Sequence, residues 1–138
     1  MAARALLLDH PVARVVLHRV EGVEVLSLEA KMFPSVEQVR DFMPKYSALV
    51  REHAPARVMT DLRQFMGAPL SVHIEYAKFL GAVRPHVCRS AIFGLRPSTG
   101  ALVRLVLRLA GRHDMLIAAT EPQALDWVLT GSCEKQAV

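Results

Sequence analysis

Short runs of β-branched and aliphatic residues alternate along the chain with longer segments in which apolar residues recur every three or four positions. The first two runs, residues 12–20 and 23–28, are separated only by Glu21-Gly22, which is typical of a tight hairpin turn. Three later runs are short and apolar, and they predict strands over residues 57–61, 90–95 and 115–119. The pattern therefore predicts an opening hairpin followed by three buried strands.

Ser35 begins the first predicted helix, because Gln38 follows three residues later as in a capping box. Apolar residues then recur at helical spacing until the helix ends near His53. Pro44 lies inside this segment and removes one backbone donor. We expect it to kink the helix or to divide it into two shorter ones.

Helical spacing marks three further segments. Ser71 is expected to cap the second helix, whose apolar stripe faces the core. The third helix covers residues 101–110 and ends at Gly111. Thr120 and Gln123 repeat the capping pattern before the last helix.

The predicted order ββαβαβαβα indicates a single α/β domain with a mixed five-stranded sheet and helices packed on it. A chain of 138 residues fits one domain, and 52% hydrophobic against 22% charged residues is typical of a globular protein. We expect the core to cover about residues 12–130 of the domain 1–138. Residues 131–138 are expected to form a flexible tail.

Composition limits the classes of binding partner that we expect for this protein. The net charge of +4 comes mainly from arginine, but the arginines form no basic run with interleaved aromatics, so nucleic acid is not an expected partner. No apolar stretch is long enough to span a bilayer. We expect a cytoplasmic protein, either free or peripheral at the inner face of the membrane. Cys88 and Cys133 are expected to be reduced, because two distant cysteines form no disulfide framework.

The chain carries no catalytic signature, so we expect a protein that is not an enzyme. Ser71 and His73 are two residues apart and therefore point to different faces of a helix. Asp61 and Arg63 end a strand where α/β folds often place ligands, but such a pair is at least as often a structural ion pair or a hydrogen-bonding device of the loop, so no catalytic role is assigned to it. The six histidines lack metal-ligand spacing, so neither a metal nor a cofactor is expected.

The segment 101–110 is the most informative for function. Arg104, Arg108 and Arg112 recur every four residues and occupy an arc of roughly 80°, whereas aliphatic residues fill roughly 200°. A helix that rests on a sheet needs an apolar stripe of only about 100°. One interpretation is a helix buried on more than one side with an arginine rim. In the other interpretation, the apolar surface that the sheet does not cover binds a ligand, a partner or lipid. The residues involved are then Leu102, Arg104, Leu105, Arg108, Leu109 and Arg112.

The turn before this helix adds a second candidate site. Arg96, Ser98 and Thr99 lie where backbone donors at a helix N-terminus favour anions, for example a lipid phosphate. The alternative is that Ser98 or Thr99 simply caps the helix. The segment lacks the Gly-Lys-Ser/Thr of a nucleotide-binding loop.

Three features of the chain resemble the SpoIIAA-like group of the STAS superfamily, whose fold is related to the CRAL-TRIO lipid-binding domains. They are the opening hairpin, Thr60-Asp61-Leu62-Arg63-Gln64-Phe65, and Ala124-Leu125-Asp126-Trp127-Val128-Leu129. The resemblance covers about residues 15–129. It implies hydrophobic-ligand binding and membrane association through movable helices.

Ser71 lies close to the phosphorylatable serine of STAS-type anti-sigma-factor antagonists. Those proteins usually have an Asp-Ser-Ser or Asp-Ser-Thr run, whereas this chain reads Ala68-Pro69-Leu70-Ser71-Val72. Ser71 is therefore either a plain helix cap or a regulatory site.

These observations favour a non-enzymatic domain that binds a hydrophobic or amphipathic ligand, with peripheral membrane association through the basic helix. The partner is then a hydrophobic compound or an anionic lipid surface. The alternative is a STAS-type regulatory module that docks a protein partner or a second copy of itself.

Overall fold

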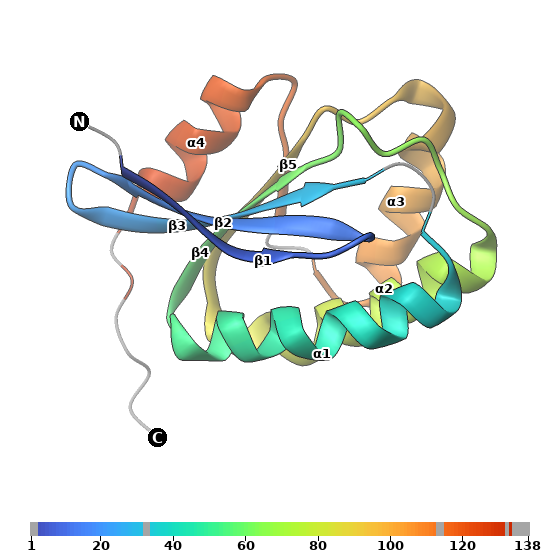
Figure 1. Ribbon diagram of the computed structural model, residues 1–138. Coiled ribbons are helices and arrows are strands. Elements are labelled where there is room, and N and C mark those ends of the chain that lie inside the picture. Colours follow the sequence, from blue (N-terminus) through green and yellow to red (C-terminus); the bar gives the residue numbers. More distant parts are fainter. Residues whose placement is uncertain (1–2, 32–33, 113–114, 132, 134–138) are drawn as a thin grey trace.

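The computed structural model describes residues 3–31, 34–112, 115–131 and 133 (Figure 1). The strands are β1 (Ala3–Asp9), β2 (Ala13–Val20), β3 (Val23–Ala30), β4 (Ala56–Asp61), β5 (Val87–Phe93) and β6 (Met115–Ile117). The helices are α1 (Val36–Glu52), α2 (Leu70–Val83), α3 (Pro97–Leu109) and α4 (Glu121–Leu129), with a 3₁₀ turn η1 (Arg84–His86) after α2.

One mixed sheet contains the strands in the order β1-β2-β3-β4-β5-β6. β1, β2 and β3 pair antiparallel, whereas β3 to β6 pair parallel. The predicted α/β fold class is confirmed, but the sheet has six strands where the sequence predicted five. The additional strand is β1, which precedes the predicted core and pairs with one neighbour only. Its apolar run is short because an edge strand buries little of its surface.

The opening hairpin is confirmed. Val20 pairs with Val23 across the turn, and Glu21 and Gly22 have φ angles of 52° and 80°. Two successive positive φ angles match the right-handed twist of the flanking strands, and glycine adopts such angles without steric cost.

The helices form two layers around the sheet: α1, α2 and α3 cover one face, and α4 lies on the other (Figure 1). The reason lies in the parallel strands, which are added in chain order from β3 to β6. Each crossover between parallel strands is right-handed, so three crossovers in the same direction place their helices on the same face. Only α4, which follows the last strand, returns over the opposite face.

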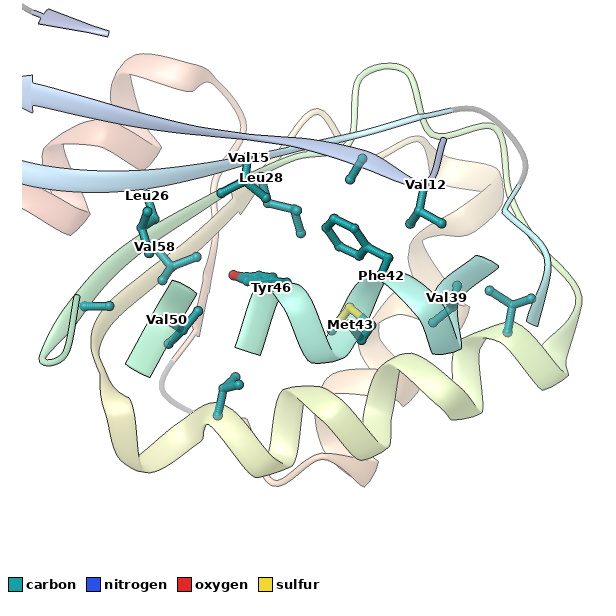
Figure 2. Packing of buried hydrophobic residues seen from close by; sticks show 14 residues of the cluster. Val12, Val15, Leu26, Leu28, Val39, Phe42, Met43, Tyr46, Val50 and Val58 are labelled. Carbon is teal, nitrogen blue, oxygen red and sulfur yellow. The ribbon is translucent and has the colours of Figure 1, made fainter. Parts of the chain in front are cut away.

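α1 packs its apolar side on the sheet. Figure 2 shows Phe42 and Tyr46 of this helix beneath Val15 and Leu28 of the sheet, and all four are buried. The predicted capping box of Ser35 is present. The division into two helices was wrong, because α1 continues through Pro44. Pro44 is exposed, so the carbonyl group that it leaves without a partner can bind water.

The starts of two later helices differ from the prediction. α2 begins at Leu70 with Pro69 as its N-cap and has no side-chain cap, so the assignment of Ser71 as the cap was wrong. α3 begins at Pro97, four residues before the predicted start, because proline suits the first position of a helix. At α4 the prediction is confirmed, since the Thr120 hydroxyl accepts a hydrogen bond from the Gln123 N–H.

The end of α4 is fastened to β4 and β5. The Arg57 Nη1 donates to the Val128 carbonyl at 2.6 Å, and the Arg89 guanidinium lies 4.0 Å from the centre of the Trp127 ring. Cys88 and Cys133 form a disulfide across 45 residues of sequence. The expectation of two reduced cysteines was therefore wrong, and residue 133 is tied to β5 rather than part of a free tail. Residues 134–138 of the predicted tail lie outside the described residues.

Candidate hydrophobic binding site

A cavity of about 70 Å³ lies between the sheet and the helices on its first face. On the helical side of the cavity, α2 contributes His73, Tyr76 and Leu80, and α3 contributes Val103, Val106 and Leu107. On the opposite side, the sheet contributes Leu28, Ala30 and Ile92. Among the described residues that line the cavity, none is an aspartate, glutamate, lysine or arginine. The lining is therefore suited to an apolar group.

The cavity continues toward α1. Phe42 and Met43 border it, and Figure 2 shows both side chains on the part of α1 that packs under the sheet. Both are almost fully buried. Three helices and the sheet thus enclose the same space, so its size depends on how closely α2 and α3 pack.

The outer side of α3 carries the surplus of apolar surface that the sequence predicted. Val103, Val106 and Leu107 are buried against the cavity, whereas Leu105 and Leu109 are 39% and 62% exposed. Arg104 and Arg108 are exposed on the same helix, and Leu102 is half-buried. The helix is therefore not sealed on all its aliphatic sides, and exposed leucines lie beside exposed arginines.

Arg112 does not belong to this surface. It is only 3% exposed, and its Nη1 donates to the Leu80 carbonyl at 3.3 Å. The Arg112 N–H donates to the Leu107 carbonyl at 2.8 Å, which closes a turn at the end of α3. The expectation that Arg112 continues the exposed arc was wrong, because the helical repeat ends before it is reached.

The turn before α3 holds no side-chain cap. Arg96 is the N-cap residue, and the Thr99 hydroxyl donates to the Arg96 carbonyl at 3.1 Å. The alternative that Ser98 or Thr99 caps the helix was therefore wrong. Ser98 and Arg96 are exposed, whereas Thr99 is buried. The structure thus brings Arg96 and Ser98 to the surface at the start of α3, ahead of Arg104 and Arg108.

α2 adds exposed apolar residues that the sequence analysis did not assign. Leu70 and Ile74 are 53% and 42% exposed, and Met66 in the preceding loop is 40% exposed. Ser71 is exposed between Leu70 and Ile74. The i, i+4 spacing of Leu70 and Ile74 was the available signal in the sequence. Neither residue belongs to the core-facing stripe from which the helix was predicted.

His73 is the other residue that sequence reasoning missed. It lines the cavity, is 3% exposed, and its Nε2 has no hydrogen-bond partner among the residues that the structure describes. Burial lowers the pKa of His73, and a hydrogen bond with the Ala68 backbone opposes this shift. The Phe65 ring packs edge-on against the imidazole, with 6.0 Å between ring centres. No feature of the sequence distinguished His73 from the other five histidines.

Asp61 and Arg63 form an ion pair, one of the structural alternatives for these residues, with 2.8 Å between the Arg63 Nη2 and the Asp61 Oδ2. The Arg63 N–H also donates to the Asp61 Oδ1 at 2.9 Å, and the guanidinium lies 5.1 Å from the centre of the Phe93 ring. The Asp61 carboxylate raises the pKa of Arg63. These contacts close the loop after β4, outside the cavity.

Comparison with known proteins gives a similarity of fold. Neither a protein-family model nor a curated protein matches the chain. Among solved structures, the chain is similar to the crystal structure of an uncharacterized DUF3478 protein with a SpoIIAA-like fold from Shewanella loihica PV-4. The TM-score is 0.66 at 14% sequence identity, over 90% of this chain and 99% of that one. The chain therefore has the SpoIIAA-like fold that its sequence predicted.

Proposed function

We propose that this protein is a non-enzymatic domain that binds a small hydrophobic group in the cavity beneath α2 and α3. The observation that carries the proposal is the cavity itself, which is apolar on nearly every side. Apolar pockets with few polar groups are the usual form of small-molecule sites. The SpoIIAA-like fold is consistent with a binding domain.

The volume limits what can bind. An apolar cavity of about 150 Å³ is large enough for benzene. The cavity of about 70 Å³ therefore accepts a group of a few carbon atoms, or the end of a longer chain. A larger ligand requires α3 to move away from the sheet.

Movement of α3 would be favoured at an anionic lipid surface. Leu105 and Leu109 are exposed in this structure and would be buried by lipid. Each arginine near an anionic surface contributes about 1 kcal/mol, so Arg104 and Arg108 together contribute about 2 kcal/mol. No helix of the described ranges 34–112 and 115–131 is long and apolar enough to cross a bilayer. We therefore propose attachment along the membrane surface through α3.

Filling the cavity tests ligand binding. In Val106→Phe a ring replaces a side chain that lines the cavity, whereas Leu109→Phe adds a ring on the exposed side of the same helix. Native mass spectrometry of the gently purified protein is expected to show a retained hydrophobic compound in the wild type and in Leu109→Phe, but not in Val106→Phe. Added pentane should bind with the same selectivity. Equal pentane binding by Val106→Phe and the wild type would show that the cavity is not the site.

Liposome co-sedimentation tests membrane attachment. The wild type is expected to bind vesicles that contain phosphatidylserine and to remain free with phosphatidylcholine alone. Arg104→Glu/Arg108→Glu should abolish this binding. Arg19→Glu/Arg51→Glu makes the same change in net charge at exposed positions on β2 and α1 and should retain most of it. Equal loss in the two double variants would reduce the effect to net charge and contradict a role for α3.

A regulatory interaction module is the second candidate, and the exposure of Ser71 between Leu70 and Ile74 favours it. An apolar surface around a hydroxyl could dock a second copy of the chain and be switched by phosphorylation. This candidate predicts a ligand-free dimer in native mass spectrometry that Ser71→Glu dissociates. A monomer with a retained hydrophobic compound would favour the first proposal instead.

A further inference from the structure

One residue of the cavity lining carries a buried hydrogen-bonding atom without a partner among the described residues. This residue is His73, the fourth residue of α2, which is 3% exposed. Its Nε2 is buried and has no partner within the described part of the chain. Buried polar atoms are nearly always paired, so an unpaired one beside a cavity indicates a group that arrives from outside.

Burial lowers the pKa of His73 and so favours the neutral ring. A neutral imidazole has one nitrogen that donates and one that accepts, so Nε2 takes either role according to the tautomer. An alcohol hydroxyl can both donate and accept, and it can therefore pair with Nε2 in either tautomer.

We infer that the Nε2 atom of His73 forms a hydrogen bond with the hydroxyl group of the bound ligand. This inference rests on the proposed function and gives it a ligand class: neutral aliphatic alcohols whose carbon chain fills the apolar part of the cavity. Carboxylates are excluded, because no cationic side chain is among the described lining residues and a neutral imidazole leaves the buried carboxylate charge unpaired. Thr60 and Tyr76 are the other described lining residues with a hydroxyl group.

The experiment compares three probes of similar length: butan-1-ol, pentane and butanoate. Their affinities are measured by chemical-shift titration of the wild type, His73→Phe and Tyr46→Phe. His73→Phe keeps an aromatic ring against Phe65 and removes Nε2. Tyr46→Phe is the matched control, because it removes the hydroxyl group of a buried aromatic residue that is not among the lining residues of the cavity.

We expect His73→Phe to weaken butan-1-ol binding roughly 10-fold, the effect of leaving a buried hydroxyl unpaired, and to leave pentane binding unchanged. Tyr46→Phe should change neither, and butanoate should not bind the wild type. The ¹⁵N resonance of His73 Nε2 in the wild type should move on saturation with butan-1-ol, which tests the contact even if a variant does not fold.

Each other result has a separate meaning. If butan-1-ol and pentane bind but His73→Phe affects both equally, or the Nε2 resonance stays in place, the inference is overturned and the proposed function stands. Binding of butanoate as tight as that of butan-1-ol overturns the ligand class. If no probe binds the wild type, the proposed function fails as well.

Discussion

Gly94 lies directly against Arg63. A Cβ atom at Gly94 would be 2.5 Å from the Arg63 Cγ and 2.8 Å from the Arg63 backbone nitrogen. Gly94 also has a φ angle of +78°, which side chains rarely adopt. The Leu62 N–H donates to the Phe93 carbonyl at 3.0 Å, so the chain after β4 and the chain after β5 are held together at this point.

Gly94→Ala is therefore expected to lower the free energy of unfolding by about 3 kcal/mol or more, from a strained φ angle together with a backbone clash. Gly22→Ala is the control, because Gly22 has a φ angle of +80° but nothing within 4 Å of an added Cβ. It should cost about 1 kcal/mol. Urea denaturation measures both. Equal losses in the two variants would show that the contact with Arg63 contributes nothing.

The two serines at helix starts should respond differently to alanine. The Ser35 hydroxyl accepts a hydrogen bond from the Gln38 N–H at 3.2 Å, so Ser35→Ala is expected to cost about 1 kcal/mol. Ser71 is exposed and follows an N-cap that has no side-chain hydrogen bond, so Ser71→Ala should leave stability nearly unchanged. Thermal unfolding of both variants checks this, and a larger loss at Ser71 would contradict the helix start at Leu70.

Stability should increase with pH between about pH 5 and pH 7. Burial lowers the pKa of both His73 and His18 from the ordinary value of 6.5. The unfolded chain therefore binds more protons than the folded one in this range, and the free energy of unfolding rises with pH. Stability is lost as the pH falls below the unfolded pKa.

Mutation of each histidine shows how much it contributes to this pH dependence of stability. His73→Phe and His18→Gln should each reduce the pH dependence of the urea midpoint in that range. The pKa values of Asp9, Asp41 and Glu75 are lowered by hydrogen bonds to basic partners, and these carboxylates lose their contribution only at lower pH. A urea midpoint that falls from pH 5 to pH 7 would contradict the neutral burial of the two histidines.

Breaking the disulfide between Cys88 and Cys133 should destabilise the domain by about 2–4 kcal/mol, because the intact disulfide closes a long loop in the unfolded chain. The two cysteines are 45 residues apart. Cys133→Ser and a reducing agent should have the same effect and should not add to each other. Two free thiols in the purified, unreduced protein would contradict the bond.

Local patterns predicted local structure well. Ser35 with Gln38 and Thr120 with Gln123 mark helix starts that the structure confirms, because each cap forms between residues three apart. Helical spacing also predicted the surplus of apolar surface on α3, where Leu105 is 39% exposed. The errors at Ser71 and Arg112 arose where a proline or a terminal turn, rather than a side-chain pattern, sets the end of the helix.

By itself, the sequence determined the order of the strands and α-helices from β2 onward, the α/β class and the amphipathic character of α3, since these depend on spacing along one segment. Only the tertiary structure decided the cavity, the unpaired Nε2 of His73 and the pairing of Cys88 with Cys133. Each of these joins residues from different elements. Their proximity depends on the direction of the crossovers and on which face of the sheet each helix covers, and neither is encoded in the spacing of a single segment.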